Sequence, residues 1–169
     1  NSREIQAITA YLKWLSENAP ADSITRNPLP YLTRAADSTN GSRLYTSTCK
    51  RCHGQNGEGF READHSTFRY PPLWGLKSYS TGAGMYQVTK LARFIKYNMP
   101  YDKPPGRIVL TDEEAYDLAA YINSQKRQTF DISHDWPVMS TKPVDYPFGP
   151  YADNFSADRH KYGPWLNLK

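Results

Sequence analysis

The sequence predicts an all-α fold, and three observations lead to that prediction. Apolar residues recur at intervals of three and four positions in three stretches of the 169-residue chain, which is the period of a helix with one apolar face. Thr111 and Glu114 form a helix-capping box before the last of these stretches. A further stretch ends in two cysteines three positions apart, which places both thiols on one turn of helix.

Four helices are expected along the chain, at residues 2–18, about 40–52, about 85–97 and 111–124. Ser2 is the expected N-cap of the first helix, and Ala19 and Pro20 end it. The positions that form the apolar faces share the helical period, and they are Ile5, Ile8, Leu12, Leu15, Val88, Leu91, Ala92, Ile95, Ala115, Leu118, Ala119 and Ile122.

Three long segments lack a helical period. Residues 19–36 contain three prolines and are expected to form an extended linker. Residues 60–84 carry several glycines and prolines and are expected to form an ordered loop, and a loop of that length is usually functional. Residues 129–169 are rich in Pro, Tyr, Asp and Gly, so we expect an irregular tail laid over the surface.

The composition excludes some classes of protein and raises a question about the core. The 21 Lys and Arg against 17 Asp and Glu form no run of five or six, so no nucleic-acid-binding arm is predicted. No apolar stretch approaches the roughly 20 residues of a membrane-spanning helix. Counted with glycine and without tyrosine, apolar residues make up about 36% of the chain, below the roughly 45–50% of ordinary soluble domains.

The two cysteines, Cys49 and Cys52, are followed at once by His53. A Cys-x-x-Cys-His string is typical of covalent attachment of haem c. Both thiols can reach the vinyl groups on one edge of the porphyrin, and His53 then faces the iron as its proximal ligand. A buried porphyrin is a large apolar body, so it also accounts for the low apolar share. Thioether attachment occurs outside the bacterial cytoplasm, so a periplasmic location is expected.

Three other interpretations of the cysteine pair are weaker. A zinc site usually needs a second pair of ligands at a suitable spacing, and the chain contains no further cysteine. A thioredoxin-like redox pair belongs to a βαβ pattern, which is not visible around it. A structural disulfide would leave His53 unexplained.

The order helix, Cys-x-x-Cys-His, loop, helix, Met-Pro and capped helix predicts a class I cytochrome c fold around one covalent haem. The sixth iron ligand then comes from the segment after the third helix, where Met99 precedes Pro100. A thioether ligand favours reduced iron and raises the reduction potential, which suits electron transfer. Met85 and Met139 are the competing methionines; the first opens a helix and the second lies in the tail.

The remaining polar side chains predict no catalytic residue. The carboxylates of residues 112–114 are explained by helix capping, and no Ser-His-Asp arrangement is readable. Trp74 and Tyr79 are expected to line the haem pocket. The other side chains with ligand chemistry are each expected at the surface or beside the ligands, and they are His65, His134, His160 and Lys96.

Three groups of motifs carry a resemblance to a known family. The groups are residues 70–75 with 78–79 and 82–85, residues 98–100 with 111–123, and residues 146–153 with 155–156 and 160–164. The first two groups resemble the haem domains of sulfur-oxidising cytochromes, both the thiosulfate dehydrogenase family and, more distantly, the SoxA type. The third group resembles the C-terminus of thiosulfate dehydrogenases more than that of the SoxA type.

The resemblance implies a role in sulfur chemistry. Thiosulfate dehydrogenases are periplasmic di-haem enzymes that oxidise two thiosulfates to tetrathionate or run the reverse. Their first domain holds a catalytic haem with His and Cys ligands, and their second holds an electron-transfer haem with His and Met ligands. This chain is similar to the second domain, and residues 2–18 look like the closing helix of the first.

The chain also departs from that family. It has one Cys-x-x-Cys-His string and no third cysteine, so it lacks the catalytic haem and its cysteine ligand. Some members carry a lysine beside the ligating methionine as an alternative ligand; here that position is Asn98, so a Lys/Met switch is not expected at this place. The chain begins at Asn1 without Met or a signal peptide and is interpreted as a processed chain or a fragment.

These observations predict three regions. Residues 1–36 are a helix and a Pro-containing linker, interpreted as the remnant of a preceding cytochrome domain. Residues 37–126 are a class I cytochrome c domain, and residues 127–169 are an irregular extension packed on that domain. The predicted function is single-electron transfer as the electron-transfer half of a thiosulfate dehydrogenase or tetrathionate reductase. The expected partners are a second haem domain or subunit and a soluble redox protein. The alternative is a stand-alone mono-haem carrier in periplasmic sulfur metabolism. A sensing module, in which Met99 leaves the iron and a small ligand binds, has no support in the sequence.

Overall fold

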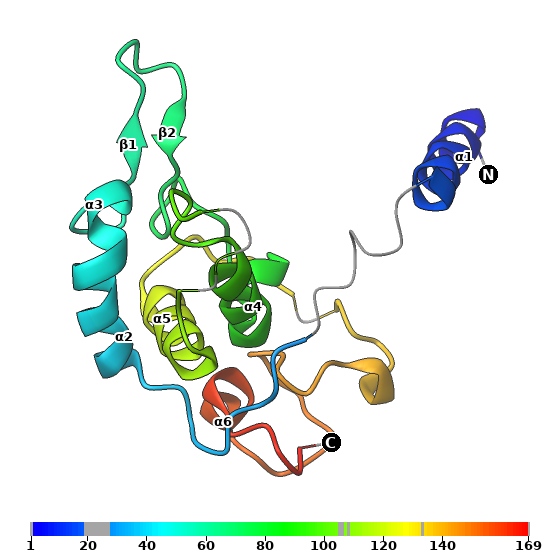
Figure 1. Cartoon of the computed structure of the whole chain (residues 1–169). Helices are drawn as coiled ribbons and strands as arrows, with labels where there is room; N and C mark the ends of the chain where they lie inside the picture. The colour runs from blue at the N-terminus through cyan, green and yellow to red at the C-terminus, as the bar shows by residue number, and fades with distance from the viewer. Residues whose placement is uncertain (1, 19–27, 105–106, 108, 133, 169) are drawn as a thin grey trace.

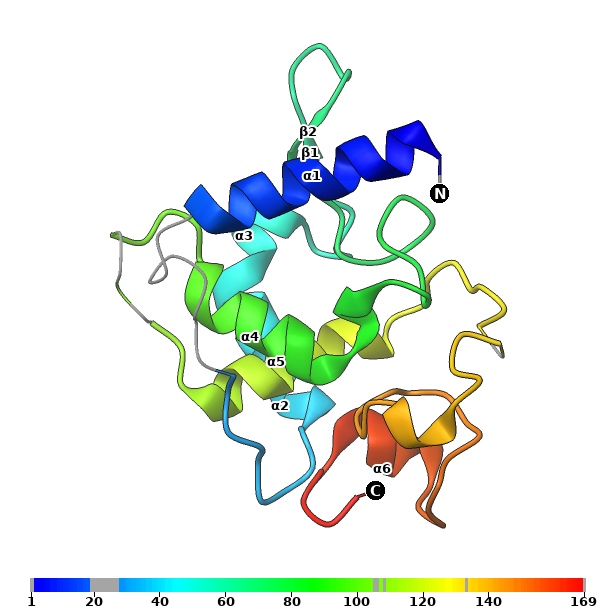
Figure 2. The same ribbon diagram turned by 90° about the vertical axis from the view of Figure 1, so that its right-hand side faces the viewer.

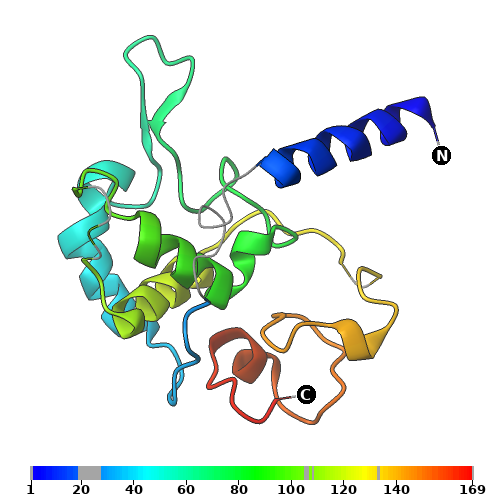
Figure 3. The same ribbon diagram turned by 45° about the vertical axis from the view of Figure 1, so that its right-hand side comes forward.

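The computed structural model describes residues 2–18, 28–104, 107, 109–132 and 134–168. Within these residues the chain is mostly helical, with one antiparallel sheet of two short strands (Figure 1). The helices after residue 37 pack together as the body of the molecule, whereas helix α1 (Arg3–Asn18) stands apart from it (Figures 1 and 3). The prediction of a mainly helical fold is therefore confirmed.

Helix α1 forms where the periodicity predicted it. The hydroxyl of Ser2 accepts a hydrogen bond from the backbone N–H of Ile5 at 3.4 Å, as expected of an N-cap. Its apolar face is exposed to solvent, with Ile5, Ile8 and Leu12 each more than half exposed. Ala19 and Pro20, which were expected to end this helix, lie outside the described residues.

A continuous helical run carries the cysteines. It consists of α2 (Ser38–Leu44), a π-helical turn η2 (Tyr45–Cys49) and α3 (Lys50–His53). The run begins two residues earlier than predicted because Asp37 caps it, accepting hydrogen bonds from the backbone N–H groups of residues 39 and 40. A π-helical turn is a rare local widening of a helix, and here its last residue is Cys49.

The second half of the body is formed by η3 (Gly84–Tyr86), α4 (Val88–Asn98) and α5 (Asp112–Ser124). The predicted helix at 85–97 is therefore divided, with Gln87 in an extended conformation between the turn and α4. The capping box of Thr111 and Glu114 is present in both directions, which confirms the predicted start of α5.

Close contact between α2 and α5 depends on a glycine. A Cβ atom at Gly41 would lie 1.9 Å from the backbone oxygen of Asp117, so only glycine permits this approach. The predicted apolar faces of α4 and α5 are buried in the same core. The buried apolar residues of this core include Tyr45, Val88, Leu91, Ala92, Ile95, Leu110, Ala115, Tyr116, Leu118, Ala119, Ala120 and Ile122.

The expected linker at 19–36 is only partly described, because residues 19–27 lie outside the described residues. Its second part contains no helix, as predicted, yet it is not a free connection. Leu29, Leu32 and Ala36 are buried in the core, so this segment packs on the body of the domain.

The expected loop at 60–84 contains a small hairpin that the sequence did not predict. Strands β1 (Phe60–Arg61) and β2 (Phe68–Tyr70) pair antiparallel, with Phe60 opposite Tyr70. Strands of two and three residues are too short to show a period of two in the sequence. The hairpin projects from the body next to α3 (Figure 1).

The prediction of an irregular surface tail after residue 128 is wrong in part. This segment contains η4 (Met139–Thr141) and α6 (Ala157–Tyr162), and it gathers at the end of the body opposite the hairpin (Figures 1 and 2). Trp165 is 2% exposed and its ring centroid lies 5.3 Å from that of Tyr116 on α5. A single tryptophan adds a large apolar area to a core without creating any periodicity.

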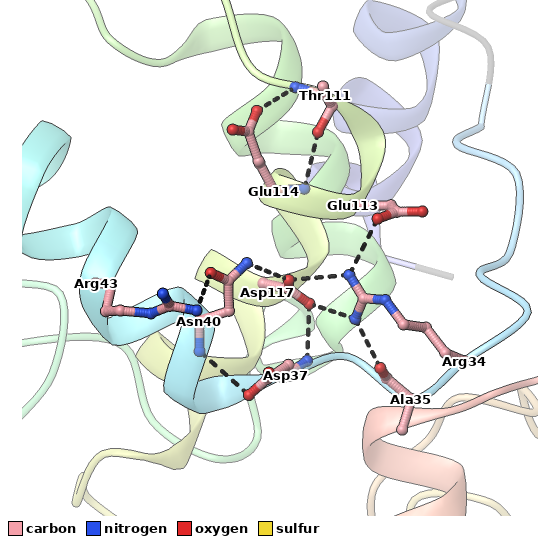
Figure 4. A network of polar contacts seen from close by, with 9 residues as sticks. All are labelled: Arg34, Ala35, Asp37, Asn40, Arg43, Thr111, Glu113, Glu114 and Asp117. Carbon is pink, nitrogen blue, oxygen red and sulfur yellow. Dashed lines mark hydrogen bonds and ion pairs between the residues drawn. The ribbon is translucent and has the colours of Figure 1, made fainter.

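A buried carboxylate joins the start of the domain to α5 (Figure 4). Asp117 accepts hydrogen bonds from both terminal nitrogens of Arg34, at 2.8 and 3.0 Å, from the backbone N–H of Asp37 at 2.7 Å and from Asn40 Nδ2 at 2.8 Å. Burial by itself raises the pKa of this carboxyl, but these hydrogen bonds outweigh burial and hold its pKa below the usual range.

Candidate haem site

The helical run η2–α3 presents two free thiols three positions apart. Cys49 ends the π-helical turn and Cys52 lies in α3; both are free and partly buried. Burial, together with the neighbouring Cys52, raises the pKa of the Cys49 thiol to about 11, so this group is protonated at neutral pH. Two unbonded thiols at this spacing are suited to forming two thioethers on one side of a porphyrin.

His53, at the end of α3, is oriented by a backbone carbonyl. Its Nδ1 lies 2.9 Å from the oxygen of Pro71. A carbonyl only accepts hydrogen bonds, so Nδ1 carries the proton and Nε2 keeps a free lone pair. This arrangement is typical of a metal-binding histidine, whose second nitrogen is usually hydrogen-bonded. This role of Pro71 was not predicted, because a backbone carbonyl leaves no side-chain signal in the sequence.

The loop after His53 is closed by an aromatic cluster. The hydroxyl of Tyr45 donates a hydrogen bond to the oxygen of Gly54 at 2.7 Å. The Trp74 ring lies 5.2 Å from that of Tyr45, measured between centroids. Gly57 has a φ of +63°, and a Cβ there would lie 2.5 Å from the Trp74 ring, so glycine is required beneath the indole. Trp74 therefore packs against the loop that follows the attachment segment.

Several apolar side chains, one of them Cys49, lie at the edge of the core. They are packed on the core but retain exposed surface, and they include Cys49, Leu73, Trp74, Met85, Tyr97 and Met99. A large, flat apolar group held by the thiols would cover this kind of surface and gain free energy by removing it from water. The residues present therefore fit a covalently attached porphyrin.

Tyr79 is anchored to α5 through its hydroxyl. That group donates to Asn123 Oδ1 at 2.8 Å, while Asn123 Nδ2 donates to the backbone oxygens of Met85 and Tyr86. Burial raises the pKa of Tyr79 to about 12, even though the nearby cation of Arg127 acts in the opposite direction. The structure thus gives Tyr79 a clear role in holding its loop to the helix.

Arg127 is a candidate pocket residue that the sequence did not indicate. Its guanidinium lies 4.2 Å from the centroid of the Tyr79 ring and donates to the backbone oxygens of Tyr79 and Ile122. Among the described residues, Arg127 Nε and Ser78 Oγ are buried and lack a hydrogen-bond partner. Buried donors of this kind fit a bound group that carries acceptor oxygens, as the haem propionates do.

Met99 lies directly after α4 and is partly buried against the core. Its backbone N–H donates to the oxygen of Ile95 at 2.9 Å, and the Met99–Pro100 peptide bond is cis. Met85 also packs on the core from η3, whereas Met139 lies in η4 of the C-terminal segment. Met99 therefore directly follows α4, the helix that was expected at about residues 85–97.

The other candidate ligands differ in their surroundings. His65 and His134 are exposed, as expected. His160 was expected at the surface or beside the ligands, but it is 1% exposed and its ring nitrogens lie 2.7 Å from the oxygen of Val144 and 3.0 Å from Asp153 Oδ1. Lys96 forms an ion pair of 2.7 Å with Asp112.

Zinc chemistry finds little support in the described part of the chain. No group of three or more His, Cys, Asp or Glu side chains is arranged there to hold a metal ion. A structural zinc site needs four such ligands, so Cys49 and Cys52 lack the further donors within these residues.

The described part of the chain contains no helix with both the length and the apolar character needed to cross a membrane.

Comparisons with known proteins identify the family of this chain. The family model for cytochrome c matches residues 38–126. Thiosulfate dehydrogenases from Allochromatium vinosum and Stutzerimonas stutzeri are 39% and 37% identical over 124 and 131 residues, which cover 72% and 75% of this chain. The chain spans only 44% and 41% of the length of these two relatives.

A solved structure that is similar to this chain is also a thiosulfate dehydrogenase. The thiosulfate dehydrogenase TsdBA from Marichromatium purpuratum, in its as-isolated form, superposes with a TM-score of 0.58 at 36% identity. The match covers 85% of this chain and 31% of that one. The resemblance to thiosulfate dehydrogenases predicted from the motifs is therefore confirmed.

Proposed function

Because this chain belongs to the cytochrome c family, we propose that it transfers single electrons through one covalently bound haem c. In this proposal Cys49 and Cys52 form the thioethers, and His53 and Met99 are the axial ligands of the iron. The bound haem supplies the Fe(II)/Fe(III) couple. With a protein ligand on each side of the iron, no position is open for a substrate, so this chain is not catalytic alone.

The observation that carries the proposal is the orientation of His53. His53 completes the Cys-x-x-Cys-His string, and its Nδ1 lies 2.9 Å from the backbone oxygen of Pro71. That hydrogen bond selects the tautomer with a free Nε2 and fixes the plane of the ring. A proximal iron ligand needs both properties before the haem is attached.

Several observations support Met99 as the second ligand. It lies directly after α4, on the segment that class I cytochromes use, and it is partly buried against the core. The competing groups are engaged elsewhere, since Lys96 is paired with Asp112 and both ring nitrogens of His160 face acceptors. A His/Met pair favours reduced iron and suits an electron carrier.

We further propose that the chain is the electron-transfer half of a periplasmic thiosulfate dehydrogenase-like enzyme. The relatives that it matches are thiosulfate dehydrogenases, and the match covers 44% and 41% of their length. The regions would then be a helix and linker at 1–36, a class I haem domain at 37–126 and an extension at 127–169. The exposed apolar face of α1 supports contact with a preceding haem domain, because burying such a face is favourable.

The alternative is a stand-alone mono-haem carrier that exchanges electrons with a soluble protein. A single Cys-x-x-Cys-His string supports it. The two forms are distinguished by the mass of the native protein and its haem content by the pyridine haemochrome assay. A native product with two haems per chain supports the enzyme half, and one haem on a protein of this length supports the carrier.

Ligation is tested by the weak near-infrared absorption band that a methionine bound to ferric haem produces. Met99→Ala is expected to remove this band and to lower the reduction potential. Met85→Ala is the matched control and keeps the band, because Met85 lies in η3 and not after α4. Survival of the band in Met99→Ala would show that another residue binds the iron.

The absence of catalysis by this half is tested with thiosulfate and ferricyanide. The haem-loaded 169-residue chain is expected to show no turnover, because it lacks a second Cys-x-x-Cys-His string. Turnover by this chain alone would contradict the proposed division of labour.

A further inference from the structure

The segment after α4 is fastened by one lysine side chain. The last carbonyls of a helix have no partner within the helix, and those of Lys96 and Tyr97 are in this position. The ammonium of Lys103 lies 3.4 Å from the oxygen of Lys96 and 3.1 Å from that of Tyr97. It also lies 3.2 Å from the backbone oxygen of Met99. The side chain thus connects the end of α4 to Met99.

The ammonium has three backbone acceptors within hydrogen-bond distance. A lysine ammonium has three N–H donors and no acceptor, and here it meets three carbonyl oxygens. The C-terminal end of a helix carries a partial negative charge, so a cation is favoured at this place. Lys103 is partly buried, which reduces screening by water and strengthens the interaction.

The contact restrains Met99 from two sides. Its N–H donates to the oxygen of Ile95, and its own oxygen accepts from Lys103. The backbone N–H of Lys103 also donates to the oxygen of Pro100 at 3.4 Å, so residues 99–103 fold back as a turn. Asn98, the neighbour of Met99, is turned away, because its Nδ2 donates to the oxygen of Phe94 on α4.

We propose that Lys103 is a positioning residue that holds the Met99 thioether ready to bind the haem iron. This inference rests on the proposed role of Met99 as an axial ligand. Lys103 does not bind the iron. It restricts the backbone conformations of residues 99–103, so the Met99 sulfur stays close to its ligating position. Without it, more of the protein has Met99 away from the iron, and an external ligand competes more easily.

Imidazole binding to the ferric, haem-loaded chain measures this competition, followed by the shift of the Soret band. Lys103→Met removes the three donors while keeping an unbranched side chain. It is expected to bind imidazole about tenfold more tightly than the wild type, which corresponds to about 1.4 kcal/mol. Lys90→Met is the matched control; it removes one positive charge from an exposed position at the other end of α4 and is expected to match the wild type.

Lys103→Arg is the second variant, used in case Lys103→Met does not fold. It retains the charge, but a planar guanidinium does not match the three carbonyls as an ammonium does, so an intermediate imidazole affinity is expected. Equal affinities in Lys103→Met, Lys103→Arg and Lys90→Met would overturn the inference. If Lys103→Met fails to retain haem, the affinity of Lys103→Arg alone decides it, and a value equal to the wild type overturns the inference.

The near-infrared band of the wild type separates this test from that of the proposed function. A wild type without the band refutes methionine ligation, and the role of Lys103 is refuted with it. A wild type with the band, combined with unchanged imidazole affinity in the Lys103 variants, refutes only the role of Lys103.

Discussion

The Asp117→Asn substitution is expected to destabilise the domain by about 2–4 kcal/mol, because it breaks half of a buried hydrogen-bond network. One carboxylate oxygen accepts from Arg34 Nη1 and from the N–H of Asp37, and the other accepts from Arg34 Nη2 and from Asn40 Nδ2 (Figure 4). Asparagine keeps one of these oxygens. Its amide nitrogen replaces the other and faces two donors, so two hydrogen bonds become repulsive contacts.

The magnitude follows from the burial of the group. The Asp117 side chain is 1% exposed, while Arg34 is 40% exposed and regains water when its partner is lost. A hydrogen bond to a charged group contributes about 1.5–3 kcal/mol, and two are lost, with partial recovery by solvation of Arg34.

The assay is guanidinium chloride unfolding of the haem-loaded protein at pH 7, followed by far-ultraviolet circular dichroism. Glu113→Gln is the matched control, since Glu113 also contacts Arg34, at 3.4 Å, but is 68% exposed. The control is expected to lose less than about 0.5 kcal/mol, as exposed ion pairs usually do. If both variants lose the same free energy of unfolding, the burial argument is refuted.

The same carboxylate makes stability depend on pH in a defined direction. The pKa of Asp117 is lower in the folded state than its ordinary value of about 3.9, so the unfolded chain binds the proton more readily. Its contribution to stability is therefore fully present above about pH 4 to 5 and is lost as the pH falls through the folded pKa. The stability difference between wild type and Asp117→Asn is expected to shrink over that acid range, and a difference that stays constant down to pH 2 would contradict the assignment.

Three further substitutions test other parts of the fold. Trp165→Ala is expected to lower the free energy of unfolding by about 3–5 kcal/mol, measured by denaturant titration, and a loss below about 1 kcal/mol would mean that the C-terminal segment does not belong to the core. Gly57→Ala is expected to cost about 1–3 kcal/mol in the same titration because of its positive φ and the Trp74 ring above it; a neutral result would contradict that packing. Asp102→Asn breaks an ion pair of 2.7 Å with Arg51, and both side chains are more than half exposed. Thermal unfolding is expected to show a loss of stability of at most about 1 kcal/mol, and a smaller loss at high salt than at low salt. A larger loss that does not depend on salt would show that the pair is not a surface contact.

The helices were predictable because their signals are local. Ser2, the capping box of Thr111 and Glu114, and the apolar faces of α4 and α5 all lie within one or two turns of the residues that they organise. The hairpin at 60–70 and helix α6 were missed for the opposite reason. They are shorter than the windows over which a period is visible, and their stability comes from contacts with distant residues.

The candidate attachment residues are visible in the sequence, whereas the groups around them are not. Cys49, Cys52 and His53 are adjacent in the chain, so their chemistry is visible as a string. The carbonyl of Pro71, which orients His53, and the guanidinium of Arg127, which holds the Tyr79 backbone, come from other segments. Neither belongs to a motif, because any residue supplies a carbonyl and most arginines lie on the surface.

The sequence by itself determined that the chain is helical, that its cysteine–histidine string suits haem attachment, and that it resembles thiosulfate dehydrogenases. These conclusions depend on spacing along the chain, and spacing is local information. The tertiary structure decided that the C-terminal segment contributes Trp165 to the core and that Asp117 joins Arg34, Asp37 and Asn40. It also decided that Lys103 closes the turn containing Met99. Each of these contacts depends on burial and hydrogen-bond geometry between segments, which become defined only when the chain has folded.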